Sequence, residues 1–313
     1  MSKTILALGS LLPAEMETLE RHFKVVRMGR KSDPEAILRE YGHEVSGLIS
    51  SVGSPVTRKL MEALPNLEII CRYGIGVDNI DLAAAGERAV AVTNTPGLVT
   101  NDTADVAMAL LLGCARRTME GDMYVRVGKW LNGPMGLGVT LSGKTVGIVG
   151  LGRIGQAVAR RALAFDMQVA YYGRREKPEF PYSYVPDLIK LAEQSDFMII
   201  TVAGGEPTRH LIDGAVLRAL GPQGFLVNVS RGTVVDEAAL VKALEDKTIA
   251  GAGLDVFENE PHVPEALMKM DNVVLLPHIG TATQETRSRM GQLVIENLLA
   301  HFSGQPLKTP VAA

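Results

Sequence analysis

Short apolar runs alternate with stretches of helical periodicity along the whole chain. In the first hundred residues the stretches 34–41 and 57–64 have helical spacing, and apolar runs typical of strands lie around them. The predicted strands of this part are 5–8, 24–28, 47–50, 67–74 and 89–94. Because strands separated by helices are typical of parallel sheets, we expect a parallel α/β sheet here.

A second series of the same kind follows a long helical pattern, which runs from Thr103 to about Lys129 without a proline. A last helix is expected over 284–302. The predicted strands of the second series are 145–150, 168–173, 197–202, 225–230, 249–256 and 272–277. The sequence therefore predicts an α/β protein of two parallel-sheet units that a long helix joins.

Composition and charge narrow the class of protein. The chain has 313 residues, enough for two domains, and its 46% hydrophobic and 21% charged residues are typical of a globular protein. The formal net charge of −3 argues against a basic surface for nucleic acid. Two cysteines, Cys71 and Cys114, are too few for a disulfide framework and lie in apolar surroundings, which favours free thiols in a reducing compartment.

No apolar segment has the length of a membrane span. The longest one, 106–115, is about half of the ~20 residues that a spanning helix needs. Gly9 and Pro13 interrupt the apolar start of the chain, so we interpret it as a first strand rather than an export signal. We therefore expect a cytoplasmic protein that binds neither membranes nor nucleic acid.

The most informative motif is Gly150-Leu-Gly152-Arg-Ile-Gly155. It directly follows a predicted strand and opens a helical stretch, which is the context of a dinucleotide-binding turn. Gly150 permits the tight turn, Gly152 lets the backbone approach a pyrophosphate, and Gly155 lets the helix pack on the strand. The helix start, with Arg153 and Ile154, offers N–H groups and partial positive charge to phosphates.

A second phosphate-binding pattern in this region is rejected. Residues 138–145 fit G-x-x-x-x-G-K-[ST], which should follow a strand and open a helix. Here Gly143, Lys144 and Thr145 precede a predicted strand, so no helix start supplies N–H groups. We interpret the segment as a turn that leads into the strand.

The ribose of the cofactor is expected at the end of the second strand of this unit. An acidic residue there is typical of NAD-preferring sites, but this chain has Gly173, Arg174 and Arg175. Guanidinium groups suit a 2′-phosphate. We therefore predict NADPH as the cofactor, with NADH as the less favoured alternative; in the simpler interpretation both arginines belong to a solvated turn.

Three polar residues could form a reaction centre. Arg231 and His278 each fall just past a predicted strand and Glu260 lies a few residues beyond one, at the sheet edge that faces the ligand crevice. A histidine exchanges protons at neutral pH, a carboxylate orients it, and an arginine binds a carboxylate or a developing oxyanion. Each residue alone is more often a surface polar group, and the same ambiguity applies to Asp255.

Six blocks of sequence, in order, carry a resemblance to a known family. They include RYGIGVDNIDL, GIVGLGRIG and LPHIGTATQETR, and they are 72–82, 94–105, 147–155, 228–240, 253–261 and 276–287. With these blocks the chain resembles the D-isomer-specific 2-hydroxyacid dehydrogenases, most of all the NADPH-dependent glyoxylate/hydroxypyruvate reductases. The resemblance implies two Rossmann-like domains: a discontinuous substrate domain of residues 1–98 and 282–313, and a dinucleotide-binding domain of residues 99–281.

The resemblance also implies roles for single residues. His278 is the expected acid/base, Glu260 its partner, and Arg231 the residue that binds the substrate carboxylate and polarises the carbonyl. The backbone N–H groups of Ile75 and Gly76 would hold the same carboxylate. The expected cofactor-binding residues are Thr103, Gly150, Gly152, Arg153, Ile154, Gly155, Gly173, Arg174, Arg175, Thr208, Val229, Asp255, His278 and Gly280. No metal ligand is expected. After strand 197–202 the family commonly has a proline-bearing segment, whereas this chain reads AGGEPT, which leaves the cofactor contacts of that loop open.

The reaction expected from these residues is reduction of a small 2-oxo acid, glyoxylate or hydroxypyruvate, to a D-2-hydroxy acid. Two alternatives stay open: a D-lactate-like dehydrogenase of the same family, and an NAD(H)-sensing binding protein of the corepressor type on the same fold. The long helix and the following arm to Gly138 predict a homodimer. Trp130 is expected at that interface or at the neighbour's site, with an ordinary core position as the simpler interpretation.

Overall fold

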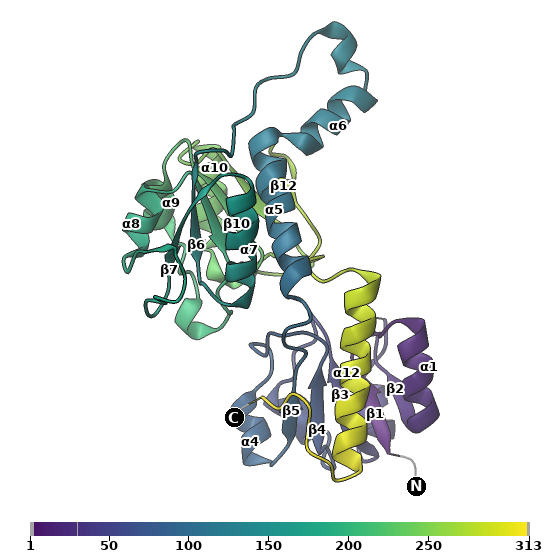
Figure 1. Ribbon diagram of the computed structural model, residues 1–313. Coiled ribbons are helices and arrows are strands. Elements are labelled where there is room, and N and C mark those ends of the chain that lie inside the picture. Colours follow the sequence, from purple (N-terminus) through teal and green to yellow (C-terminus); the bar gives the residue numbers. More distant parts are fainter. Residues whose placement is uncertain (1–2, 30, 312–313) are drawn as a thin grey trace. The chain divides into compact units, whose positions relative to one another are not determined.

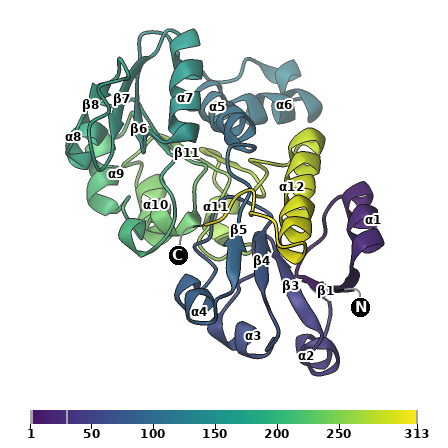
Figure 2. The same cartoon turned by 60° about the horizontal axis from the view of Figure 1, so that its bottom comes forward.

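The chain forms two compact units in a computed structural model that describes residues 3–29 and 31–311 (Figure 1 and Figure 2). Unit 1 combines the chain up to Val99 with the chain from Thr281 onward, and unit 2 spans Thr100–Gly280. The C-terminal helix therefore belongs to the same unit as the first strand.

Unit 1 is built on a five-stranded parallel sheet with the order β2-β1-β3-β4-β5. Its strands and helices are β1 (Thr4–Ala7), α1 (Pro13–His22), β2 (Lys24–Arg27), α2 (Pro34–Tyr41), β3 (Val45–Ser50), α3 (Arg58–Glu62), β4 (Ile69–Arg72), α4 (Leu82–Glu87), β5 (Ala91–Thr93) and α12 (Gln284–Phe302). Ile5 packs with Leu298 of α12 on one face, whereas Leu6 packs with Met61 of α3 on the other. Helices thus cover both faces of the sheet, as parallel sheets require.

Unit 2 is built on a seven-stranded parallel sheet with the order β12-β11-β10-β9-β6-β7-β8. Its strands are β6 (Thr145–Val149), β7 (Gln168–Tyr172), β8 (Ser183–Tyr184), β9 (Phe197–Ile200), β10 (Phe225–Asn228), β11 (Gly251–Leu254) and β12 (Val273–Leu275). Its helices are α5 (Thr100–Arg116), α6 (Thr118–Arg126), α7 (Arg153–Ala164), α8 (Leu188–Glu193), α9 (Gly214–Leu220), α10 (Glu237–Glu245) and α11 (Glu265–Met268), with short 3₁₀ turns η1 (Lys129–Asn132), η2 (Glu206–Thr208) and η3 (Gly232–Val234). Helices α5 and α7 cover one face and α8 to α11 the other (Figure 1).

The strand order of unit 2 reverses beside β6. The chain runs from β6 through β7 to β8 in one direction, and from β9 through β10 and β11 to β12 in the other. Loops that leave the carboxyl ends of β6 and β9 therefore diverge, and open α/β sheets bind their ligands at such a point. This topology makes the turn after β6 the first place to look for a site.

The predicted α/β class is confirmed, and every predicted strand overlaps an observed one. The observed strands are mostly shorter than the apolar runs. Gly74 and Gly150 have φ of 156° and 100°, so the chain leaves the sheet before the apolar run ends. β8 was not predicted, because two residues carry no periodic signal.

The single long helix expected from Thr103 to about Lys129 is wrong. α5 ends at Arg116, Arg117 has a left-handed φ of 54°, and α6 begins at the next residue. The Arg117 guanidinium donates to the Glu120 carboxylate at 2.7 Å, which favours the restart over a continued helix. The break redirects the chain into a separate segment, residues 117–139, which we call the arm.

The arm extends beyond the end of α5 (Figure 1). Several of its apolar side chains are exposed. Trp130 is 68% exposed, so its interpretation as ordinary core is wrong for the chain taken by itself. The other exposed apolar residues of the arm are Met119, Met123, Val125, Val127, Leu131 and Leu137. Large exposed apolar patches are typical of contact surfaces.

Residues 3–29 and 31–311 contain neither a membrane-spanning helix nor a cluster of metal-ligand side chains. None of the helices there is both long and apolar enough to cross a membrane. In the same part of the chain, no group of three or more His, Cys, Asp or Glu side chains is arranged to hold a metal ion. Cys71 and Cys114 are both buried and free.

Candidate active site

The glycine turn between β6 and α7 has the open geometry that a dinucleotide needs. A β-carbon at Gly150 would meet Val202, and one at Gly155 would collide with the carbonyl of Gly150. At Gly152, by contrast, nothing lies within 4 Å of a β-carbon, and α7 begins there without a side-chain cap. The first N–H groups of α7 therefore suit a phosphate, and the turn fits the pyrophosphate of a dinucleotide.

A basic loop follows β7 and lies against this turn. Arg174 and Arg175 are exposed, directly after Gly173. Lys177, which sequence reasoning missed, donates from Nζ to the carbonyl of Leu151 at 2.8 Å. The loop thus carries three basic side chains beside the turn, together with the exposed Glu176, and Gly173 supplies no carboxylate at the position where NAD-preferring sites have one. The third basic residue of the run RREK is the signal that could have found Lys177.

His278 and Glu260 form a pair at the carboxyl edge of the unit 2 sheet. His278 Nδ1 lies 2.8 Å from Glu260 Oε2, and the Phe257 N–H donates to Glu260 Oε1 at 3.1 Å. Burial by itself would raise the pKa of Glu260, but the His278 hydrogen bond and charge, the Phe257 N–H and the Arg231 charge lower this pKa on balance. An ionised Glu260 holds the proton on Nδ1 of a neutral or charged imidazole, so Nε2 is the atom for proton exchange.

Asp255 holds His278 in a strained backbone conformation. His278 has a left-handed φ of 54°, which costs roughly 1–2 kcal/mol for a residue with a β-carbon. The buried Asp255 carboxylate accepts from the N–H groups of Ile279 at 2.7 Å and Gly280 at 2.8 Å. Burial raises the pKa of Asp255 although these hydrogen bonds oppose the shift. Strain that neighbouring contacts maintain is typical of functional sites.

Arg231 lies just past β10, in a loop that Asn228 shapes. Asn228 is buried; its amide donates to the carbonyl of Arg231 at 2.9 Å and accepts from the Ser230 N–H at 3.0 Å. The Arg231 guanidinium is half-buried at the same sheet edge as His278 and Glu260. Sequence reasoning missed Asn228, and the signal was a polar residue that ends an apolar strand.

Three other expected cofactor residues have contacts inside unit 2. Thr103 is buried in α5 and its hydroxyl donates to the carbonyl of Gly280 at 3.3 Å. The Thr208 hydroxyl donates to the carbonyl of Ala203 at 2.7 Å and so closes the glycine-containing loop after β9. Val229 is buried at the end of β10.

The expected carboxylate-binding turn lies in unit 1, after β4. Its carbonyls are held from within the unit: that of Ile75 accepts from the Asn94 amide at 2.8 Å, and that of Gly76 from the buried Arg72 guanidinium at 2.9 Å. No hydrogen bond in the described part of the chain uses the N–H of Ile75 or Gly76. Backbone N–H groups in such a turn suit an anion.

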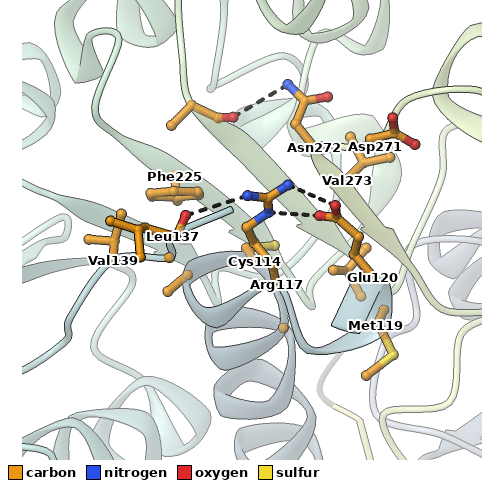
Figure 3. Close-up of a pocket in the computed structure, with 15 residues that line it drawn as sticks. Cys114, Arg117, Met119, Glu120, Leu137, Val139, Phe225, Asp271, Asn272 and Val273 are labelled. Atoms are coloured by element: carbon orange, nitrogen blue, oxygen red, sulfur yellow. Dashed lines mark hydrogen bonds and ion pairs between the residues drawn. The ribbon is translucent and has the colours of Figure 1, made fainter. Parts of the chain in front are cut away.

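A pocket of about 250 Å³ lies elsewhere in unit 2, at the base of the arm (Figure 3). Figure 3 shows Arg117 between the Glu120 carboxylate and the carbonyl of Leu137, with Cys114 and Phe225 in the wall. Burial raises the pKa of the Cys114 thiol to about 12, so the thiol stays protonated and is a poor nucleophile. None of the proposed catalytic residues lines this pocket.

Comparison with known proteins assigns the family. The family model described as D-isomer specific 2-hydroxyacid dehydrogenase, NAD binding domain, matches residues 108–280. Glyoxylate/hydroxypyruvate reductase A from Arabidopsis thaliana is 45% identical over 293 residues, 94% of each chain. Hydroxyphenylpyruvate reductase from Plectranthus scutellarioides is 44% identical over 310 residues, 97% of this chain and 99% of the relative.

A solved structure agrees with these relatives. The crystal structure of an NADPH-dependent glyoxylate/hydroxypyruvate reductase from Sinorhizobium meliloti, in complex with NADP and malonate, matches with a TM-score of 0.93 and 44% identity. The match covers 100% of this chain and 97% of that chain. The resemblance carried by the six sequence blocks is confirmed, and the chain belongs to the D-isomer-specific 2-hydroxyacid dehydrogenase family.

Proposed function

We propose that the protein reduces small 2-oxo acids, above all glyoxylate and hydroxypyruvate, to D-2-hydroxy acids with NADPH. The observation that carries this proposal is the 2.8 Å pair of His278 and Glu260, at the same sheet edge as Arg231 and the glycine turn. The names of the Arabidopsis and Sinorhizobium relatives support the substrate class.

The residues that would hold the cofactor are those of the glycine turn and the loops beside it. When bound, reduced nicotinamide supplies a hydride to the substrate carbonyl. Gly150 to Gly155 would hold the pyrophosphate, and the loop 173–177 the 2′-phosphate. Asp255 would face the nicotinamide amide. The NADP in the Sinorhizobium structure supports this assignment.

The chain's own side chains account for proton transfer and orientation. His278 donates a proton from Nε2 to the carbonyl oxygen, and Glu260 keeps the imidazolium oriented and charged. Arg231 and the N–H groups of Ile75 and Gly76 bind the substrate carboxylate, and the guanidinium polarises the carbonyl. The protein thus contributes position and electrostatics rather than a covalent intermediate.

The proposal extends to organisation and location. Unit 1 would be the substrate domain and unit 2 the dinucleotide domain of a cytoplasmic homodimer. The exposed apolar side chains of the arm, including Trp130 and Leu131, support a dimer contact there. Light scattering at micromolar concentration tests it, and a monomer would contradict it.

Absorbance at 340 nm with NADPH and a panel of 2-oxo acids tests the activity, with His278→Ala as the background control. We expect glyoxylate and hydroxypyruvate to give the highest kcat/KM. A higher value for pyruvate would indicate a D-lactate-like dehydrogenase, and one for hydroxyphenylpyruvate would indicate the activity that names the Plectranthus relative. NADPH binding without oxidation by any acid would favour the sensing protein.

A further inference from the structure

Three loops at the carboxyl edge of the unit 2 sheet carry the residues of the proposed site. Main-chain hydrogen bonds connect the first two loops. The loop after β9 contains Thr208, and the loop after β10 contains Arg231. His210 N–H donates to the carbonyl of Thr233 at 2.8 Å, and Asp236 N–H to that of Ile212 at 2.9 Å. These two hydrogen bonds tie the first loop to the second.

The third loop, after β11, packs directly on the second. A β-carbon at Gly232 would collide with the carbonyl group of Phe257 and the nitrogen of Glu258. The Glu258 N–H also donates to Glu237 Oε2 at 3.1 Å, in the first turn of α10. This contact sets the main chain just before Glu260.

The side chain of Glu258 ties the third loop to the first. Its Oε1 accepts from Arg209 Nη2 at 2.9 Å and lies 3.2 Å from His210 Nε2. The Glu258 side chain is 21% exposed, so solvent screens this ion pair less than a fully exposed one. None of the three residues has a part in the proposed chemistry.

We propose that Glu258 is a positioning residue, which keeps the Glu260 carboxylate on His278 by tying its loop to Arg209 and His210. This inference rests on the proposed function, because it concerns the acid/base pair assigned there. One residue separates Glu258 from Glu260, and the Phe257 N–H on its other side is the donor to Glu260 Oε1. A shift of the main chain at Glu258 therefore moves both the carboxylate and the group that orients it.

Two variants break the tie from opposite sides. Glu258→Gln removes the acceptor's negative charge, and Arg209→Gln removes the donor's positive charge. Glu193→Gln, at an exposed position at the end of α8, is the matched control. Asp255 and Arg231, the other charged groups that face the pair, stay unchanged in all three variants.

A positioning role predicts the same result for both variants. A looser Glu260 stabilises the imidazolium less, so the fall of kcat/KM with rising pH should begin at lower pH in Glu258→Gln and in Arg209→Gln. We expect kcat to drop about tenfold, since a misplacement of about 1 Å can cost up to about 10²-fold. The control should match the wild type.

Two other results would overturn the proposal. If the charges act only through space, removal of the negative charge moves the profile to lower pH and removal of the positive charge moves it to higher pH. If Glu258 serves stability alone, the unfolding temperature falls in both variants and the pH profile does not move.

An NMR titration of the His278 imidazole in the cofactor-free protein separates this inference from the proposed function. Its resonance is assigned by its loss in His278→Gln. We expect the titration midpoint to move to lower pH in both variants and not in the control. A wild type without reductase activity would refute the proposed function, whereas an unmoved midpoint would refute the positioning role of Glu258.

Discussion

In each unit the first strand leads through a turn into a helix, but the two helix starts carry different residues. In unit 2, β6 leads through Gly152 into α7, whose first turn has no acidic residue. In unit 1, β1 leads through Leu12 and Pro13 into α1, whose first turn contains the buried Glu15. The Glu15 carboxylate accepts from the Ser288 hydroxyl at 2.5 Å and occupies the helix start with negative charge. One helix start therefore suits a phosphate and the other excludes it.

The carboxyl edges of the two sheets differ in the same way. Charged side chains, Arg231, Glu260 and His278, gather at the edge of unit 2, whereas the turn after β4 in unit 1 offers backbone N–H groups at Ile75 and Gly76. One kind of sheet thus supports either acid/base chemistry or anion binding. Function follows from the residues placed at the edge, and the fold decides only where that edge is.

The largest effect is expected at the charged edge. His278→Ala should lower kcat for glyoxylate by about 10²–10⁴-fold, which is typical of a lost general acid. NADPH affinity should change much less than kcat, whereas the unfolding temperature should fall, because the substitution also removes the ion-pair partner of the partly buried Glu260. Steady-state kinetics measures kcat, and a thermal melt measures the unfolding temperature. Turnover like that of the wild type would remove His278 from the mechanism.

Glu260→Gln should change the pH dependence of both stability and activity. The pKa of Glu260 is lowered in the folded protein, so its ion pair stabilises the fold above the usual glutamate range and stops doing so as pH falls through the lowered value. The variant lacks the stabilisation by this ion pair at every pH. Urea unfolding should therefore show the largest deficit near neutral pH and a shrinking one in acid, and the kcat/KM profile for reduction should move to lower pH.

Two alanine substitutions in the glycine turn separate binding from folding. Gly152→Ala adds a methyl group that meets no protein atom, so the unfolding temperature should hold while NADPH affinity falls about tenfold or more, or ~1.4 kcal/mol. The methyl group of Gly155→Ala collides with the Gly150 carbonyl, so this variant should lower both the unfolding temperature and the NADPH affinity. Fluorescence titration and thermal melts measure the pair. Equal affinity in Gly152→Ala and wild type would contradict the phosphate site.

The basic loop beside that turn should set the choice of cofactor. A charge-assisted hydrogen bond contributes about 1.5–3 kcal/mol, so replacing Arg174 and Arg175 together by alanine should cut the preference for NADPH over NADH by about tenfold. The ratio of kcat/KM for the two cofactors measures this. An unchanged ratio would assign both arginines to solvent, and a wild-type preference for NADH would overturn the choice of NADPH.

The smallest effect is expected at the other helix start. Glu15→Gln keeps an acceptor for Ser288 and removes a buried charge, so the free energy of unfolding should change by about 1 kcal/mol. NADPH affinity should not change, because α1 takes no part in cofactor binding. Chemical denaturation and cofactor titration check the two expectations. A changed NADPH affinity would contradict the assignment of phosphate binding to the start of α7 alone.

Several features were open to sequence reasoning because their signals are local. Apolar runs of strand length predict β6 and β7, and the spacing of Gly150, Gly152 and Gly155 predicts the turn between β6 and α7. Other features carry an ambiguous local signal or none. The left-handed Arg117 looks like any helical arginine, and Lys177 stands in a run of charges that is typical of a solvated loop.

By itself, the sequence determined the order of the longer strands, the α/β class and the glycine turn, since each depends on residues only a few positions apart. Tertiary structure alone decided which distant groups meet. The Asp255 carboxylate accepts a hydrogen bond from the N–H of Ile279, 24 positions away, and Glu258 forms an ion pair with Arg209, 49 positions away. Periodicity and propensity act over one or two turns of the chain, whereas these hydrogen bonds exist only after the parallel sheet has brought its carboxyl ends to one edge.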